Sequence, residues 1–367
     1  MSQPQLLDHF EATARWMRRG GRENDVVLSS RVRLARNLRA YNFPHRAGNS
    51  ELIAVRDRAC LALEKSAPVS AGELSVVPFE EFTHPERQSL IDRHLTSRAH
   101  IQSEIGRAIC ATSDGALSVL INEEDHFRLQ TLLPGLQLDA AYALADRVDD
   151  ALESYFDERG GLAFDPQFGF LTACPTNAGT GLRVSAMLHL PALEITGKLD
   201  GVRRLASGRG LALRGTFGEG SKVWGHLHQL SNQVTLGLDE TEILLEMDAA
   251  ARQVSEQERA ARALLPEGFA LQARDQIGRA FGVLRYARTL SCREATQALS
   301  FLRLGHEIGW MKGISRQKFN ELLVWIRPAY LQVAHGKPLP GAGRDILRAE
   351  LLRPTVARVK LEIGFDA

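Results

Sequence analysis

Cysteine is scarce in this 367-residue chain, and its four cysteines lie far apart without a Cys-x-x-Cys pair. The sequence therefore indicates neither a zinc site nor a disulfide framework. Long apolar runs are also missing, because no stretch approaches the roughly 20 residues that a membrane-spanning helix needs. The first residues lack a basic segment followed by an apolar one, so we expect no membrane partner and a cytoplasmic protein.

An excess of charge of either sign is absent too. The chain has 45 basic and 44 acidic side chains, which gives a formal net charge of +1. Such a balanced chain has no overall field that would draw it to nucleic acid or to an anionic membrane surface. We therefore expect no nucleic-acid partner.

Two common motifs for holding ATP are missing. The chain contains no Gly-x-x-x-x-Gly-Lys-Ser/Thr loop, and the His-Arg-Asp and Asp-Phe-Gly motifs of protein kinases do not occur. If ATP binds to this chain, another scaffold must hold it.

The hydrophobic pattern divides the chain into two parts. Helical spacing of apolar residues over 49–66 and 136–155 predicts two helices. Short extended segments are predicted at 26–34, 74–79, 117–122, 182–190, 211–216 and 223–234. After residue 238 strand signals vanish and amphipathic helices follow. This order predicts an α+β domain over 1–250 and an all-helical domain over 251–367.

Five arginines stand in strand or loop contexts where an exposed charge is not expected: Arg31, Arg33, Arg128, Arg183 and Arg214. Alternation along a strand places the first two on one face. Each arginine alone is better explained as a surface residue. As a set they indicate an anionic partner such as a triphosphate, because guanidinium groups bind phosphate oxygens in pairs.

Acidic residues form the counterpart of this set. Glu123, Glu124 and Asp125 follow the apolar segment 117–121, where three adjacent carboxylates repel one another and should face a cation. Glu219, in Arg214-Gly-Thr-Phe-Gly-Glu219, is a second candidate. Either segment alone could be a solvated turn.

Five segments together resemble the successive motifs of the phosphagen (guanidino) kinases. They are Ser29-Ser-Arg-Val-Arg33, Asn122-Glu-Glu-Asp-His-Phe-Arg128, Cys174-Pro-Thr-Asn-Ala-Gly-Thr180 followed by Arg183, Arg214-Gly-Thr-Phe-Gly-Glu219, and Ser231-Asn-Gln233. The resemblance implies a large, mostly antiparallel sheet flanked by helices, as in the catalytic domains of phosphagen kinases and glutamine synthetase. It also implies an ATP site made by Ser29, Ser30, Arg31, Val32, Arg33, His94, Arg128, Arg183, Val184, Ser185, Ala186, Met187, Arg214, Gly215, Thr216, Phe217, Gly218 and Glu219.

The chemistry of this family requires two carboxylates. A guanidinium has a pKa above about 12 and no available lone pair, so it must be oriented and lose a proton before it attacks phosphorus. By resemblance, Glu124 and Glu219 bind the guanidinium, and Glu124 takes the proton. Cys174 as a thiolate would lie beside the substrate cation. Mg²⁺ would be held through ATP and not by a protein metal site.

The acceptor is indicated by two further features. Kinases of free arginine or creatine carry a helical N-terminal domain, whereas here the first ATP motif begins at residue 29, which suits an acceptor on a protein surface. The segment Arg344-Asp345-Ile-Leu-Arg348-Ala349 matches the Arg-Asp-x-x-Arg-Ala signature of bacterial protein-arginine kinases of the McsB type. Arg344, Asp345, Arg348 and Ala349 could bind phosphoarginine, although an exposed helix with ion pairs would look the same.

The same resemblance implies further partners and regulation. It implies protein substrates with exposed arginines, an activator protein, allosteric activation by the product, a homodimer, and a role in stress response in which phosphoarginine marks proteins for degradation by a Clp AAA+ protease. Two alternatives stay open: a kinase of a free guanidino compound, and an inactive adaptor that reads phosphoarginine. The presence of Glu124, Cys174 and Glu219 favours catalysis over the adaptor.

Overall fold

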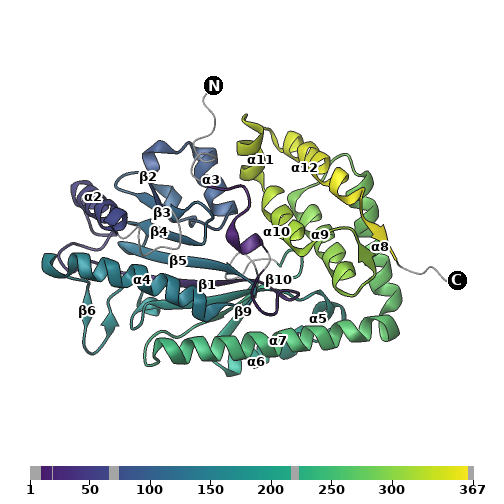
Figure 1. Ribbon diagram of the computed structural model, residues 1–367, viewed down its shortest axis with the longest axis horizontal. Helices are drawn as coiled ribbons and strands as arrows, with labels where there is room; N and C mark the ends of the chain where they lie inside the picture. The colour runs from purple at the N-terminus through teal and green to yellow at the C-terminus, as the bar shows by residue number, and fades with distance from the viewer. Residues whose placement is uncertain (1–9, 19, 66–73, 216–222, 363–367) are drawn as a thin grey trace.

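The computed structural model describes residues 10–18, 20–65, 74–215 and 223–362. Its centre is an eight-stranded sheet in which every neighbouring pair of strands is antiparallel (Figure 1). In spatial order the strands are β2 (Leu74–Pro78), β3 (Ala108–Thr112), β4 (Leu117–Ile121), β5 (Phe127–Pro134), β1 (Val27–Arg36), β8 (Leu182–His189), β10 (Leu227–Asn232) and β9 (Leu211–Gly215). The long strand β1 therefore lies in the middle of the sheet.

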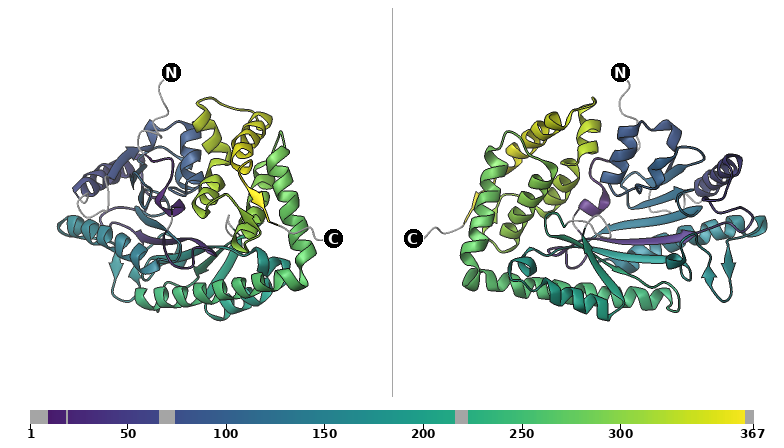
Figure 2. Two further views of the ribbon diagram at one scale, coloured as in Figure 1. Left: turned by 45° about the vertical axis from the view of Figure 1, so that its right-hand side comes forward. Right: turned by 180° about the vertical axis from the view of Figure 1, so that it is seen from behind.

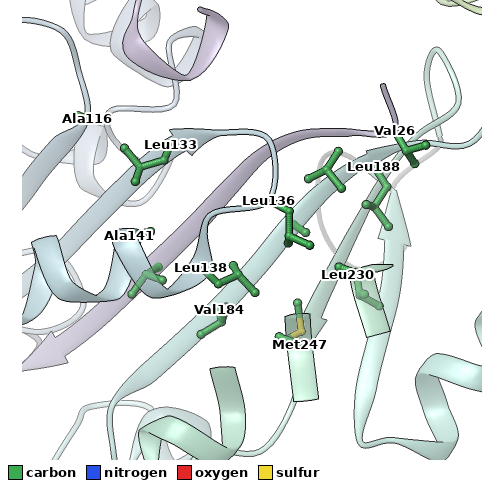
Figure 3. Close-up of a cluster of buried hydrophobic side chains, with 14 of the residues drawn as sticks. Val26, Ala116, Leu133, Leu136, Leu138, Ala141, Val184, Leu188, Leu230 and Met247 are labelled. Carbon is green, nitrogen blue, oxygen red and sulfur yellow. The ribbon is translucent and has the colours of Figure 1, made fainter. Parts of the chain in front are cut away.

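One face of this sheet is apolar and covered by helices. Side chains alternate between the faces of a strand, so Val32 of β1 and Val184 of β8, which lie opposite each other, point to the same side. On that side they join one hydrophobic core with Ala141 and Met247 from two helices (Figure 3). The other face carries polar side chains on its central strands, among them Arg33 and Arg183.

The helices of the first part surround the sheet. They are α2 (Asn49–Lys65), α3 (His84–Asp92), α4 (Leu138–Phe156), α5 (Pro191–Ile195) and α6 (Leu199–Gly208). The long helix α7 (Glu240–Gly268) begins with a capping box, in which Asp239 accepts the amide N–H of Glu242 at 2.7 Å and Glu242 accepts the amide N–H of Asp239 at 3.0 Å. It runs along the sheet and leads into the C-terminal helices (Figures 1 and 2).

The C-terminal helices gather beside one end of the sheet (Figure 1). They are α8 (Ala270–Tyr286), α9 (Cys292–Glu307), α10 (Arg316–Trp325), α11 (Pro328–His335) and α12 (Gly341–Val356). Helix α11 packs on α3, and α10 packs on η1 (Arg15–Met17), a short 3₁₀ helix. Among the described residues, no helix combines the length and the apolar character needed to cross a bilayer.

The predicted fold class is confirmed, because the sheet is antiparallel and flanked by helices and the C-terminal region is helical. Two details differ. Strands β3 and β5 were not predicted. Strand β3 is buried on every residue and its sequence shows no alternation, whereas the alternation of apolar and polar residues over 127–130 in β5 was not recognised as a strand signal. The C-terminal region is not wholly helical, since β11 (Met311–Lys312) pairs with β12 (Lys360–Leu361). Residue 250 lies within α7, and the division of the chain into domains there remains a prediction.

The shorter elements complete the chain. Strands β6 (Phe164–Asp165) and β7 (Gly169–Phe170) form a small hairpin, and 3₁₀ turns occupy η3 (Phe79–Glu81), η4 (His100–Gln102), η5 (Asp157–Arg159) and η6 (Pro175–Asn177). The last of these turns directly follows Cys174 and shapes the loop described below.

Candidate active site

The strand register brings all five predicted arginines to the polar face of the sheet. Arg33 of β1 lies opposite Arg183 of β8, and Arg31, two residues earlier, points the same way. Gln130 of β5 lies opposite Arg33, so Arg128, two residues before Gln130, points to the same face. Gln229 of β10 also points to this face, and Arg214 of β9 lies opposite it. We call these five residues the arginine face: Arg31, Arg33, Arg128, Arg183 and Arg214.

The arginine face holds more positive charge than its surroundings balance. Burial and the charge of Arg128 lower the pKa of Arg31 to about 10. Burial, together with the charges of Arg31, Arg128 and Arg183, lowers the pKa of Arg33 well below its usual value, and Glu123 opposes this effect. Among the described residues, the buried Nε of Arg33 has no hydrogen-bond partner. A buried donor without an acceptor is costly, so this face fits a bound polyanion.

The acidic loop after β4 separates its three carboxylates. Glu123 is buried and accepts hydrogen bonds from Nη1 of Arg128 at 2.7 and 2.8 Å and one from Ser97. Asp125 is buried as well, where it accepts the side-chain N–H of Asn37 at 2.6 Å and the amide N–H of Ala173 at 2.7 Å. These two carboxylates therefore fix the loop and its neighbours.

Glu124 is the exposed member of this acidic loop, and no hydrogen bond or ion pair to it occurs within the described part of the chain. Partial burial and the adjacent charges of Asp125 and Glu123 raise the pKa of its carboxyl. A carboxylate with a raised pKa binds a proton more readily, as a general base must. The structure thus distinguishes Glu124 from its neighbours, which the sequence pattern could not do.

Cys174 lies on a loop that reaches the same pocket. The loop is tied to the segment after β10, because the hydroxyl of Thr235 donates to the carbonyls of Thr176 at 3.0 Å and Ala178 at 2.7 Å. Gly179 makes this approach possible: its φ is +101°, and a Cβ there would stand 2.3 Å from the carbonyl oxygen of Thr235. Sγ of Cys174 lies 3.0 Å from the hydroxyl oxygen of Thr176.

One pocket unites these groups. It is lined by the acidic loop, the cysteine loop and part of the arginine face: Arg33, Leu34, Ala35, Glu123, Glu124, Asp125, Arg128, Cys174, Thr176, Asn177, Gly181 and Arg183. Glu124 and Cys174, predicted to act on the guanidinium, thus share a pocket with three of the arginines predicted to hold phosphate.

A second, more apolar pocket lies further along β1. Arg31 borders it, and the others that line it are Trp16, Leu28, Ser29, His94, Leu132, Ser185, Met187, Leu227, Gln229, Leu323, Val324 and Arg327. His94 is half-buried with a φ of +63° and stands edge-on to Trp16, with ring centroids 5.6 Å apart. Burial and the charges of Arg31 and Arg327 lower the pKa of His94 to about 3, so its ring is neutral at pH 7. Neutral rings and aliphatic walls suit a purine base.

The remaining predicted residues are placed as follows. Ser30, Val32, Val184 and Ala186 point to the opposite, buried face, so only their main chain could face a nucleotide. Gly215 ends β9 next to Arg214. Thr216, Phe217, Gly218 and Glu219 lie outside the described residues. The pairing of Glu124 with Glu219 therefore remains a prediction.

The C-terminal motif is split between surface and core. Arg344 donates to the carbonyl of Leu339 at 3.0 Å and is half-buried. Arg348 is 1% exposed, and its guanidinium donates to the carbonyls of Ile326 at 2.7 Å and Leu290 at 2.6 Å and to the carboxylate of Asp345. Ala349 is fully buried. Of these four residues, Arg344 and Asp345 are the accessible pair.

Several residues that line the two pockets were not predicted. Trp16, Leu323, Val324 and Arg327 come from the segments before β1 and from the C-terminal helices, far in sequence from every motif. Gln229, which accepts from Nη2 of Arg31 at 3.0 Å, lies two residues before the predicted Ser231-Asn-Gln233 segment. Alternation along β10 was the one signal that could have indicated Gln229.

The chain matches two families in succession. Residues 55–261 match the family described as ATP:guanido phosphotransferase, C-terminal catalytic domain. Residues 270–363 match the protein-arginine kinase McsB C-terminal domain. The first match spans the acidic loop, the cysteine loop and most of the sheet, and the second spans α8 to α12.

Similar proteins and structures agree with these matches. The chain is 42% identical over 350 residues to the protein-arginine kinase of Moorella thermoacetica, covering 95% of this chain and 99% of that protein. It is 44% identical over 342 residues to the protein-arginine kinase of Desulforamulus reducens, covering 93% and 94%. The crystal structure of lombricine kinase shares the fold with a TM-score of 0.57 at 22% identity, covering 71% of this chain and 72% of that one. The duplicated taurocyamine kinase of Schistosoma mansoni gives a TM-score of 0.56 at 22% identity, covering 71% and 36%.

The arginine face, the exposed carboxylate beside it and these matches point the same way: the chain belongs to the ATP:guanido phosphotransferase family and, within that family, to the protein-arginine kinases.

Proposed function

We propose that this protein transfers the γ-phosphate of ATP to arginine side chains of other proteins. The observation that carries the proposal is the pocket that joins Glu124 and Cys174 to Arg33, Arg128 and Arg183. It brings groups that attract a guanidinium next to groups that attract phosphate. The relatives named protein-arginine kinase support a protein acceptor.

The proposed nucleotide lies across both pockets. Its base occupies the apolar pocket lined by Trp16 and His94, and its phosphates lie over Arg31 and then over the rest of the arginine face. The guanidinium groups stabilise the negative charge of the transferring phosphoryl group. The unpartnered Nε of Arg33 among the described residues is suited to a phosphate oxygen.

Mg²⁺ is proposed to enter with ATP, coordinated by phosphate oxygens, and to offset their charge. The neighbouring carboxylates support this arrangement, because Glu123 is engaged by Arg128 and Asp125 by Asn37. A metal ligand set made of these side chains would have to break both interactions.

Glu124 is proposed as the general base. It accepts a proton from the guanidinium of the target arginine as the nitrogen attacks the γ-phosphorus, a P–N bond forms, and the bond between phosphorus and the bridging oxygen of ADP breaks. The thiolate of Cys174 would help hold the remaining positive charge. Glu219 is proposed to bind the same guanidinium from a second side. This residue lies outside the described residues, so its position is a prediction.

The C-terminal match supports a proposal about regulation and partners. We propose that phosphoarginine binds at Arg344 and Asp345, with Arg348 and Ala349 holding the helix, and that it activates the enzyme. An activator protein, a Clp AAA+ protease that removes the marked proteins under stress, a homodimer and a cytoplasmic location belong to the same proposal. Each rests on the resemblance of this C-terminal region to that of protein-arginine kinases.

The experiment that tests the acceptor is an incubation of the purified protein with Mg-ATP and either casein or free arginine. We expect acid-labile phosphate on casein and little ADP release with the free amino acid. ADP release with free arginine and no label on casein would indicate a kinase of small guanidino compounds. Phosphoarginine binding without any ADP release would indicate an adaptor.

A further inference from the structure

The apolar pocket has a wall that the sheet does not supply. Leu323 and Val324 belong to α10, and Arg327 lies in the turn between α10 and α11. These residues belong to the region that matches the C-terminal domain, whereas Arg31, Ser185 and Gln229 come from the sheet. The pocket proposed for the nucleoside therefore lies between the two parts of the chain.

Arg327 is the charged member of this wall. It is 9% exposed, and its Nε donates to the carbonyl of Leu323 at 3.1 Å. Its charge acts on groups from two other elements. Burial raises the pKa of Asp92 to about 6, and the charge of Arg327 opposes this rise. The same charge contributes to the lowered pKa of His94. The guanidinium thus lies near the neutral histidine at the apolar end of the pocket.

The turn that carries Arg327 is fixed from two sides. On one side Asp92, the last residue of α3, accepts the amide N–H groups of Ala329 at 3.1 Å and Tyr330 at 3.3 Å, where α11 begins. On the other side Arg348 of α12 donates to the carbonyl of Ile326 at 2.7 Å. A residue held this firmly can present its guanidinium in one orientation, which is what a binding site needs.

We propose that Arg327 contacts the nucleoside end of the nucleotide, by donating to a ring nitrogen of the base or to a ribose hydroxyl. This inference rests on the proposed function and adds a contact from the C-terminal helices to it. The aliphatic wall favours the base over the phosphates at this end, since the phosphates have the arginine face. Nucleotide binding then also stabilises the packing of α11 against α3.

Calorimetric titration with Mg-ADP tests this contact on the full-length protein. We expect Arg327→Gln to weaken Mg-ADP binding about ten-fold and Arg327→Lys to weaken it less, because a lost hydrogen bond from a charged group has about that effect. Arg279→Gln is the matched control, since Arg279 is exposed on α8 and pairs with Asp275 away from the pocket. Its affinity should equal that of the wild type.

The outcomes separate the two proposals. If the wild type binds no Mg-ADP, the proposed function fails. If the wild type binds and Arg327→Gln binds equally well, the inference alone is overturned.

A second measurement covers the case in which the variants do not fold. Hydrogen–deuterium exchange of the wild-type protein should show slower exchange in the segment 323–331 when Mg-ADP is added. Slowing confined to the strands of the sheet, with 323–331 unchanged, would overturn the inference.

Discussion

Two arginines, the half-buried Arg33 on the sheet and the buried Arg348 on α12, show opposite ways of placing a cation inside a protein. Arg348 donates to two main-chain carbonyls and to Asp345, so the fold itself satisfies it. Arg33 has other arginines as neighbours and a buried Nε without a partner among the described residues. A buried donor without an acceptor is costly unless a ligand or water completes it, whereas an arginine whose donors are satisfied stabilises the fold. The same residue type therefore has different surroundings in the two regions.

The comparison also holds along one strand. Arg36, three residues after Arg33, points to the opposite face of β1 and binds both carboxylate oxygens of Asp149 at 2.6 to 3.1 Å. Its guanidinium also lies 3.5 Å from the ring centroid of Phe170. The motif pattern alone would not show which arginine serves a ligand, but the surroundings do.

The largest effect is expected from Glu124→Gln, the exposed carboxylate that faces the arginine face. Loss of a general base should lower the rate of ADP release with casein by about 10²- to 10⁴-fold. Mg-ADP affinity should stay unchanged, because the nucleotide is held by the arginines. Weakened nucleotide binding at an unchanged rate would show that Glu124 has another role.

Arg348→Met should mainly affect stability. The change leaves the carbonyls of Ile326 and Leu290 without their donor, which should cost about 3 kcal/mol in the free energy of unfolding. Arg344→Gln, on the same helix and accessible, serves as the matched control with a change within about 0.5 kcal/mol. Urea unfolding measures the free energy of unfolding of both variants. Equal values for the two would contradict the structural role of Arg348.

Arg33→Gln should mainly affect nucleotide binding and not stability. Removal of a charge that is repelled by its neighbours should leave the melting temperature of the nucleotide-free protein unchanged or higher. Affinity for Mg-ATP should fall by about 2 kcal/mol, because a charged hydrogen bond to phosphate is lost. A clear drop in stability with normal ATP affinity would show that Arg33 is structural like Arg348.

The smallest expected effect is the change in the free energy of unfolding with pH, just below neutrality. Burial lowers the pKa of His100 and of His126 to about 4, below the ordinary value of about 6.5 in an unfolded chain. Between these values the unfolded chain takes up protons that the folded protein does not, so stability should fall as pH drops from 6.5 towards 4. Urea unfolding at several pH values should show a flatter curve for His126→Gln, and an identical curve would contradict this cause.

Much of the site could be predicted because its residues are local in sequence. Alternation along β1 places Arg31 and Arg33 on one face, and the acidic loop follows its strand directly. By resemblance Glu124 was predicted as the base. The structural roles of Glu123 and Asp125 could not be predicted, because they depend on Arg128, Ser97 and Asn37 from other elements.

Long-range packing was the other limit. Trp16 and Arg327 meet His94 only after three distant segments fold together, and no local pattern indicates such a contact. Strand β3 was missed because it is buried on every residue and lacks the alternation that indicates a strand, whereas the alternation at the start of β5 was overlooked. Arg348 was assigned to a ligand, although the fold supplies its acceptors from Leu290 and Ile326.

The most direct test of the account is mass spectrometry of the protein after incubation with Mg-ATP, under non-acidic conditions that preserve P–N bonds. The account predicts phosphate on arginine side chains of the wild-type protein and none on Glu124→Gln. Phosphate on serine or threonine alone, or equal phosphorylation of the variant, would contradict it.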